Sequence, residues 1–183
     1  MLPIGPLMIE HRLIERMIGL LARLTAGARE LGKIDPQLVD ACVDFIRVYA
    51  DRTHHGKEED ILFRALSLKK MSDEHARLMA ELVEEHKVGR RIVGELVGAN
   101  ESYRSGNARA LDSILAGLEE LAVFYPAHIS KEDKMFFPAS MRYLDKSEKD
   151  AMLEEMSAFD AGMIHEKYSQ VVKELLARAT GSA

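Results

Sequence analysis

The segment HHGKEEDILF at residues 54–63 recurs further along the chain as HISKEDKMFF at residues 128–137. Both copies read His-x-x-Lys-Glu, followed by a second acid and, after two more residues, by an apolar pair. In each copy a histidine precedes a glutamate by four residues, which places both side chains on one face of a helix, one turn apart. The repeat therefore predicts two helices that present matched His-x-x-x-Glu pairs.

A second matched feature lies upstream of each copy. Glu10-His11 precedes the first copy, and Glu85-His86 precedes the second at a step of 75 residues. The chain thus reads as two copies of a unit that has one histidine followed by His-x-x-x-Glu. Such an arrangement can supply two metal ions with a symmetric set of nitrogen and oxygen ligands.

Length and composition indicate a single folded domain. Hydrophobic residues make up 47% of the 183 residues and charged residues 30%, which is typical of a soluble, helix-rich protein. We predict one domain over residues 1–183, with a core bundle over residues 8–145. The two predicted repeats of this core are residues 8–69 and 72–143.

Several classes of partner and site are excluded by the same composition. The net charge is −5 and the basic residues form no stripe, so no nucleic-acid partner is expected. No run approaches the ~18 apolar residues of a membrane span, and the N-terminus lacks the pattern of a signal peptide. The cytoplasm is therefore the predicted compartment. Cys42 is the only cysteine, so neither a disulfide nor a cysteine-based metal site is expected.

Apolar residues recur every three to four positions through most of the chain, which predicts five helices. The first covers residues 7–31 and the last residues 147–179. The starts of the later helices are marked by capping residues or by a glycine-containing loop: Asp35-Pro36, Ser72, Ser105–Asn107 and Ser147-x-x-Asp150. Short connections favour antiparallel neighbours. The predicted fold is all-α, an up-and-down antiparallel four-helix bundle with a fifth, C-terminal helix.

The His-x-x-x-Glu pairs interrupt apolar stripes and so point toward the bundle interior. On the fourth helix, for example, the stripe runs through Tyr125, His128, Glu132 and Met135. Because a buried carboxylate without a partner is costly, these pairs predict metal ligands. The predicted ligand set adds one histidine from each of the first and third helices: His11, His54, Glu58, His86, His128 and Glu132.

The remaining histidines allow other roles. His55 lies one position off the apolar stripe, so a surface position or a supporting role beside the ligands is predicted. His75 is predicted at the end of the bundle, too far from His86 to share an ion at ~1.5 Å of rise per residue. For His165 three roles stay open: a further ligand, a gate residue or a surface histidine. Three acids are predicted to lie off the metal: Glu15, Glu59 and Asp133.

Three other residues each have two interpretations. Pro126, inside the fourth helix, is either a tolerated bend or a bend that re-aims His128. Tyr49 and Tyr125 lie before the ligand histidines of their helices. They are either core aromatics or residues that carry an electron or donate a hydrogen bond to a bound ligand.

The donor types narrow the choice of metal. Imidazole and carboxylate together suit iron, manganese or zinc, and iron is the leading choice for two ions in a helical bundle. With no thiolate set, iron–sulfur and structural cysteine–zinc sites are excluded. The predicted cofactor is therefore two non-haem iron ions, with manganese or zinc as alternatives.

These motifs, taken in order, resemble the ligand pattern of the hemerythrin-like HHE cation-binding domains. The apolar pairs Leu62-Phe63 and Phe136-Phe137 also fit that family. The resemblance covers roughly residues 8–145, and the fifth helix looks like an extension found in longer bacterial members. It implies a four-helix bundle around a non-haem di-iron centre bridged by carboxylates and by an oxo or hydroxo group.

The resemblance also implies a role for each ligand. Glu58 and Glu132 would be the bridging carboxylates, and four histidines the terminal ligands: His11, His54, His86 and His128. Oxygen-carrying members use five histidines, two of them one turn apart on the third helix. Here the residues one turn from His86 are Leu82 and Arg90. Six ligands are therefore expected rather than seven, unless His165 or a water completes the set.

The function that follows is binding or sensing of a small diatomic or peroxide ligand, such as O2, NO or peroxide, or the handling of iron. Two alternatives stay open: a di-iron redox enzyme of the peroxidase or NO-reductase type, and a structural or regulatory module held together by metal. The sequence does not decide whether the site turns over, and it leaves a homodimer open.

Overall fold

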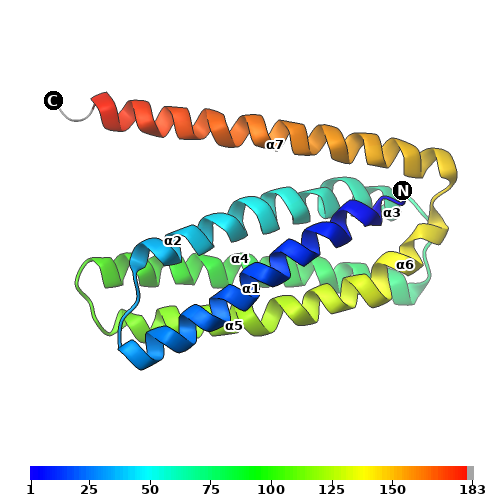
Figure 1. Cartoon of the computed structure of the whole chain (residues 1–183). Coiled ribbons are helices and arrows are strands. Elements are labelled where there is room, and N and C mark those ends of the chain that lie inside the picture. The colour runs from blue at the N-terminus through cyan, green and yellow to red at the C-terminus, as the bar shows by residue number, and fades with distance from the viewer. Residues whose placement is uncertain (181–183) are drawn as a thin grey trace.

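A computed structural model describes the backbone of residues 1–180 and the side chains of residues 1–163 and 167. Within this part of the chain the regular structure is helical and contains no strand. Four helical rods form a bundle, and a long fifth helix, α7 (Lys146–Thr180), runs along its outside (Figure 1). The predicted all-α bundle with an extra C-terminal helix is confirmed. None of the described helices combines the length and the apolarity that a membrane span needs.

The first and third rods are single α-helices, α1 (Ile4–Leu31) and α4 (Asp73–Arg104). The second rod is one continuous helical stretch in which π-helical segments interrupt the α-helix: α2 (Pro36–Asp44), η1 (Phe45–His55), η2 (Glu58–Phe63) and α3 (Arg64–Ser67). The fourth rod has a similar break near its end: α5 (Ala110–Lys131), η3 (Glu132–Phe136), α6 (Phe137–Ser140) and the 3₁₀ turn η4 (Met141–Tyr143).

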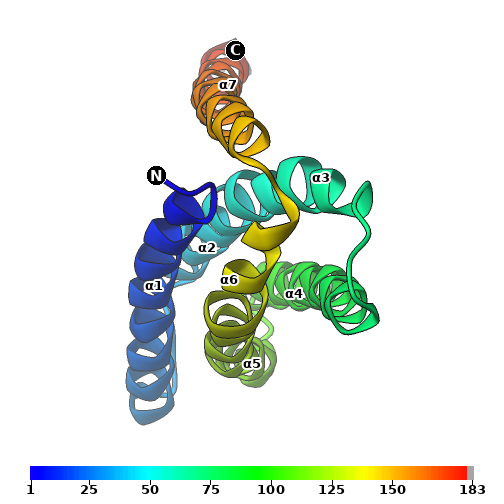
Figure 2. The ribbon, with the colours of Figure 1, turned by 90° about the vertical axis from the view of Figure 1, so that its right-hand side faces the viewer.

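Successive rods run in opposite directions, and the end view shows the four of them around a shared interior with α7 outside (Figure 2). The α5 helix packs against both α1 and α4, and α2 packs against α4. The first two rods follow one another as one helical hairpin (Ile4–Ser67) and the last two as a second (Asp73–Tyr143), while the division of the chain into two repeats stays a prediction.

The helix starts follow the expected capping chemistry in two of three cases. The Asp35 carboxylate accepts a hydrogen bond from the Gln37 amide at 2.9 Å, and the Ser72 hydroxyl accepts one from the His75 amide. The predicted capping box of α7 is wrong in its register. Asp145 and Glu148 form it instead, because each side chain accepts a hydrogen bond of 2.9 Å from the other's amide.

Two apolar clusters fill the interior, one toward each end. The larger includes Ile14, Ile46 and Leu121, and the smaller includes Leu7 and Phe137. Each rod contributes apolar residues to both clusters and changes to polar residues between them. A polar layer is thus enclosed above and below by hydrocarbon.

The π-helical segment η3 changes which residues of the fourth rod face inward. Met135, predicted in the core, is 56% exposed, whereas Phe136 is buried. A π turn closes i→i+5 hydrogen bonds and so holds more residues than an α turn. At 3.6 residues per turn the position one α-helical turn after Glu132 falls between Met135 and Phe136, and the wider π turn brings Phe136 inward. The α5 helix itself is continuous through Pro126.

Candidate metal centre

The polar layer between the apolar clusters holds seven buried side chains from all four rods. Each is at most 2% exposed to solvent. Those on the first hairpin are His11 of α1, His54 and His55 of η1, and Glu58 of η2. Those on the second hairpin are His86 of α4, His128 of α5 and Glu132 at the start of η3.

One half of the layer consists of His11, His54, Glu58 and Glu132. A nitrogen or oxygen atom from each lies within 4.8 Å of those of the others. The Nε2 atoms of His11 and His54 are 2.8 Å apart. His11 Nε2 lies 3.2 Å from a Glu132 oxygen, and His54 Nε2 lies 3.3 Å from a Glu58 oxygen. We call this group the two-histidine half.

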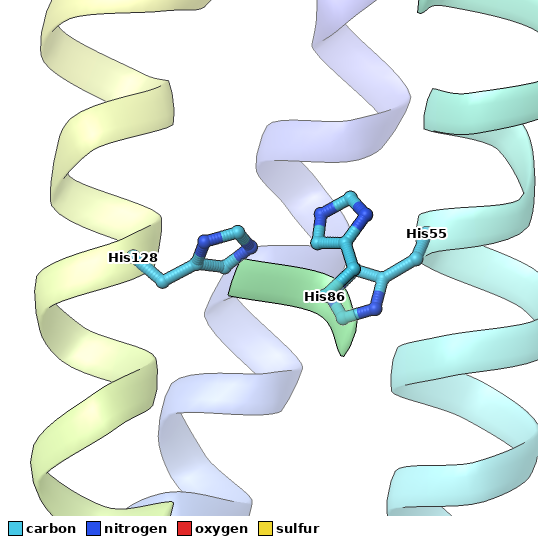
Figure 3. A group of neighbouring side chains, drawn as sticks. All are labelled: His55, His86 and His128. Carbon is cyan, nitrogen blue, oxygen red and sulfur yellow. The ribbon is translucent and has the colours of Figure 1, made fainter. Parts of the chain in front are cut away.

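The other half brings together three histidine rings from three rods, His55, His86 and His128, and we call it the three-histidine half (Figure 3). The His55 ring stacks on His86 with 3.9 Å between centroids. The His128 ring stands nearly perpendicular to His86, with centroids 5.0 Å apart. Each ring again offers a nitrogen within 4.8 Å of the others.

Both glutamates lie between the two halves. Glu58 has one oxygen 3.3 Å from His54 Nε2 and the other 3.4 Å from His86 Nε2. Glu132 has one oxygen 3.2 Å from His11 Nε2 and the other 3.4 Å from His128 Nε2. Each carboxylate therefore presents one oxygen to each half, as a ligand that bridges two ions would.

His55 is where the structure departs most from the sequence-based prediction. A surface position is wrong, because the residue is buried and its ring lies among the other histidines. The reason is the π-helical backbone of η1. Since a π turn holds more residues than an α turn, neighbouring side chains are separated by a smaller rotation about the axis. His54 and His55 can then both face the interior, one toward each half.

Each of the five histidines turns its Nδ1 atom to a carboxylate, which as an acceptor fixes the proton on that nitrogen. The Nδ1–oxygen distances are 2.7 Å for His11 to Asp133, 2.9 Å for His54 to Glu10, 3.2 Å for His55 to Asp51, 2.7 Å for His86 to Glu59, and 2.8 Å for His128 to Glu85. In a neutral ring the lone pair then lies on Nε2, the atom that faces the interior.

These outer carboxylates are in turn paired with cations. Arg12 binds Asp133, Lys131 binds Glu85, and Arg90 lies 2.8 Å from both Asp51 and Glu59. Lys57 is fully buried, and its ammonium group binds Glu10 of α1 and, at 2.6 Å, Asp160 of α7. The outer shell thus ties the ligand histidines to the bundle surface and to α7.

Most of this shell repeats between the hairpins, and its positions belong to the repeated motif. Glu10 and Glu85 are equivalent, as are Lys57 and Lys131, and Glu59 and Asp133. Sequence reasoning placed Glu59 and Asp133 off the metal, in agreement with their contacts to Nδ1 atoms, but it missed what they do. The signal was present, because these three pairs of charged residues repeat next to the ligands in both halves of the sequence.

The buried charges strongly perturb one another. Burial alone would lower the pKa of His54, but the charge of Glu58 and a hydrogen bond to Glu10 raise it to about 10. The nearby carboxylates of Glu132 and Glu58 likewise overcome burial and raise the pKa of His86 to about 11. Burial, aided by nearby His86, lowers the pKa of His55 to about 4. Without metal, protons on the histidines balance the two buried carboxylates.

The donor set fits a metal. Several polar atoms of the layer are buried without a hydrogen-bond partner among the described residues: both oxygens of Glu58, both oxygens of Glu132, and the Nε2 atoms of His86 and His128. The Nε2 atoms of His11 and His54 lie 2.8 Å apart, so without metal a proton on one of the two rings has to lie between them. That distance suits two nitrogens that each contact one ion at about 2.1 Å and roughly a right angle. A metal would satisfy all of these atoms.

Other residues lie as follows. His75 is at the end of the bundle, where its ring contacts Tyr143, and Glu15 forms the expected surface ion pair with Arg12 at 3.0 Å. The side chain of His165 is outside the described residues, so its predicted roles stay open. Tyr125 is buried, and the centroid of its ring lies 6.4 Å from that of His55. Its predicted role as an electron carrier stays a hypothesis.

Fold and site together define a helical bundle whose buried histidines and carboxylates form a candidate metal centre. The family model described as Hemerythrin HHE cation binding domain matches residues 2–140, and the chain belongs to this family. The predicted resemblance is therefore confirmed. Members of the family bind metal cations, commonly iron, and the two groups of ligand atoms fit such a site. Comparisons with curated proteins and with solved structures gave no match.

Proposed function

We propose that the seven buried side chains hold two iron ions and that the centre binds a small molecule such as O2, NO or peroxide. One ion would take the two-histidine half and the other the three-histidine half, with Glu58 and Glu132 shared between them. The observation that carries this proposal is the placement of the carboxylates, each with one oxygen toward each half. The donors, all nitrogen and oxygen, suit iron.

The division of histidines indicates where a small molecule would bind. The repeat position equivalent to His55 in the second hairpin is Ile129, which has no donor atom. The two-histidine half therefore offers fewer side-chain donors and keeps the larger share of coordination positions for an outside ligand. A bound metal pair supplies a Lewis-acidic, redox-active site at that position.

The protein's own residues prepare the site in two ways. The outer carboxylates hold each imidazole as the Nδ1–H tautomer with Nε2 directed inward. The apolar clusters above and below keep bulk water away, so that the buried charges interact strongly. Cytoplasmic location and the absence of a macromolecular partner stay predictions.

Metal analysis and absorption spectroscopy test the proposal. Protein purified anaerobically and loaded with ferrous iron should hold about two ions per chain, as the two groups of ligands imply. Exposure to air should add near-ultraviolet bands of an oxygen-bridged ferric pair, and NO should change the spectrum of the reduced form. One zinc or no metal per chain, with no response to air or NO, would refute the proposal and favour the structural-module alternative.

A further inference from the structure

Two cavities, each open to the surface on one side, flank the candidate metal centre at positions that the repeat relates. The α1–α5 cavity has a volume of about 280 Å3 and lies between the first and fourth rods. The η1–α4 cavity has a volume of about 200 Å3 and lies between the second and third rods. Ile18 lines the first where its equivalent Val93 lines the second, and Glu15 stands where the second has Arg90. One cavity is thus the counterpart of the other.

The chemistry of the two walls differs because the repeat is broken there. The η1–α4 cavity is lined by His55 and by the ion pair of Asp51 with Arg90. In the α1–α5 cavity the equivalents of His55 and Asp51 are Ile129 and Tyr125. Apart from Glu15, whose side chain is 39% exposed, the α1–α5 wall is made of aliphatic side chains, one glycine, Pro126 and Tyr125.

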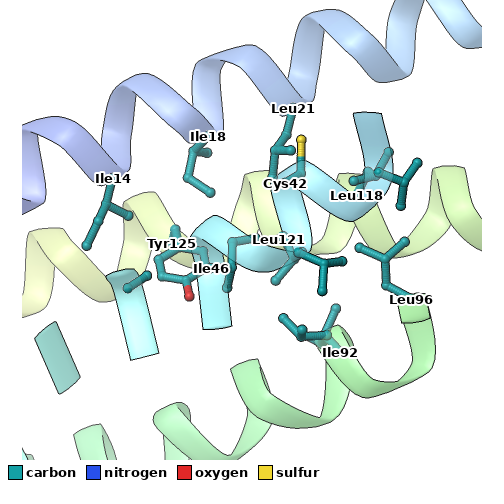
Figure 4. Close-up of a cluster of buried hydrophobic side chains, with 14 of the residues drawn as sticks. Ile14, Ile18, Leu21, Cys42, Ile46, Ile92, Leu96, Leu118, Leu121 and Tyr125 are labelled. Carbon is teal, nitrogen blue, oxygen red and sulfur yellow. The ribbon is translucent and has the colours of Figure 1, made fainter. Parts of the chain in front are cut away.

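Tyr125 lies between the cavities and lines both. In Figure 4 its hydroxyl oxygen points away from Ile18 of α1 and toward the side of the bundle where α4 lies. The α1–α5 cavity therefore meets the ring of Tyr125 rather than its polar end. Burial, reinforced by the charge of Asp51, raises the pKa of Tyr125, which keeps the ring uncharged.

The inner wall of the α1–α5 cavity includes Ile129, the residue that stands where a further histidine ligand would complete the two-histidine half. A cavity of this size is sufficient for small apolar guests, since an engineered apolar cavity of roughly 150 Å3 admits benzene or xenon. Peroxide or an anion would lose hydrogen bonds to water there without replacement, and an anion would also pass Glu15. The cavity thus selects against polar ligands.

We propose that the α1–α5 cavity is the access route and holding site for an uncharged apolar diatomic molecule on its way to the two-histidine half, with Ile129 as its inner wall. This inference rests on the proposed function and narrows its ligand class from O2, NO or peroxide to a diatomic gas. The η1–α4 cavity, with its charged wall, is not the route.

Two helical glycines provide a matched test. Gly19 lines the α1–α5 cavity, and Gly94 is its repeat equivalent; a Cβ atom at either would meet nothing within 4 Å. Gly19→Leu and Gly94→Leu should therefore both fold and load metal normally. In stopped-flow experiments on the iron-loaded, reduced protein, Gly19→Leu should slow NO association about tenfold, since an obstructing side chain must be displaced. Gly94→Leu should leave the rate at the wild-type value.

A second pair of variants and a readout independent of iron complete the test. Ile18→Phe should slow NO association, whereas Val93→Phe, which obstructs the η1–α4 cavity, should not. Crystals of the wild type under xenon pressure should show xenon in the α1–α5 cavity, and those of Gly19→Leu should not.

The outcomes separate the two proposals. A wild type that holds no iron pair or does not respond to NO refutes the proposed function. A wild type that binds NO, with a rate unchanged by Gly19→Leu and Ile18→Phe, refutes the route alone. Slowing by Val93→Phe instead assigns the route to the η1–α4 cavity. Faster reaction with hydrogen peroxide than with NO, through the α1–α5 cavity, would overturn the assigned ligand class.

Discussion

His55 and Ile129 occupy equivalent positions in the two hairpins, yet only His55 carries a donor atom. The difference makes the centre asymmetric, with three histidines on one side and two on the other. His55 also has an acceptor of its own in Asp51, whereas the residue equivalent to Asp51 is Tyr125. The two hairpins match at the other predicted ligand positions that repeat and at most outer-shell positions. They differ at His55 and Ile129, the position that would decide whether an outside ligand can bind.

Removing the His55 ring tests its assignment to the three-histidine half. We expect His55→Ala to weaken iron binding in the three-histidine half roughly 10- to 100-fold, because that ion would lose one of its three imidazoles. His75→Ala, at the end of the bundle, is the matched control and should bind iron as the wild type does. Competition with a metal indicator measures the affinity, and equal affinities of the two variants would show that His55 is not a ligand.

Adding a histidine at the equivalent position tests the open half. Ile129→His should retain the iron content while suppressing the response to NO, because a third imidazole would occupy the coordination position left for an outside ligand. Metal analysis and NO titration of the same sample measure both effects. Full NO binding by a variant that keeps its iron would contradict the assigned position.

Arg90 and Arg91 are neighbours in the sequence with different environments. Arg90 pairs with Asp51 and Glu59, which hold two ligand histidines, whereas Arg91 pairs with Glu95 and Glu120. Arg90→Gln should weaken metal binding roughly 10- to 100-fold, the usual effect of losing support behind a ligand. Competition with a metal indicator measures the affinity. Arg91→Gln should match the wild type, and equal effects of the two substitutions would contradict the argument.

At the scale of elements, π-helical segments carry four of the seven side chains of the polar layer, and α7 packs against two of these segments from outside. The α7 helix contacts η1 and η2, which carry His54, His55 and Glu58. Its Asp160 binds the buried Lys57, which in turn binds the carboxylate that holds His54. The fifth helix is therefore connected to the metal centre by a continuous chain of polar contacts.

Gly56 allows the close approach of α7 to this rod. A Cβ atom at Gly56 would lie 2.8 Å from the ring of Phe159, which is too near for van der Waals contact. Gly56→Ala should destabilise the protein by about 1–3 kcal/mol, the usual cost of overpacking, as measured by urea unfolding. Adding Phe159→Ala should recover most of that loss. If the double variant is no more stable than Gly56→Ala, the contact is not the cause.

At the scale of the whole molecule, the apolar clusters enclose a layer whose charges depend on what binds there. In the metal-free protein the pKa of His54 is raised from 6.5 to about 10, and that of His86 to about 11. A histidine with a raised pKa stabilises the fold fully below its unfolded value, and the contribution is lost as pH rises through the folded value. Protons therefore act as a substitute for metal only at neutral and acidic pH.

The metal-free protein should accordingly become less stable between about pH 6.5 and pH 10. Thermal unfolding in the presence of a chelator measures the trend as a falling Tm. The iron-loaded protein should gain in relative stability over the same range, because fewer protons compete for the ligands. A Tm of the metal-free protein that stays level or rises with pH would show that the histidines are not protonated there.

Much of the fold and part of the centre followed from local patterns. The repeated His-x-x-x-Glu spacing placed His54 with Glu58 and His128 with Glu132 on inward faces, and the structure brings them together with His11 and His86. The predicted faces of two residues were wrong. An α-helical period places His55 off the inward face and does not distinguish Met135 from Phe136, whereas the π-helical turns bring His55 and Phe136 inward.

The sequence by itself determined the helical class, the antiparallel order of the rods and the two repeated ligand pairs, because these depend on periodicity and on contacts within one turn. Only the tertiary structure decided that the centre has five histidines, that each is held by an outer carboxylate, and that the two flanking cavities differ. Those features join residues of different rods, such as His86 with Glu59 and His11 with Asp133. Such contacts depend on how the rods pack, which no spacing along a single helix specifies.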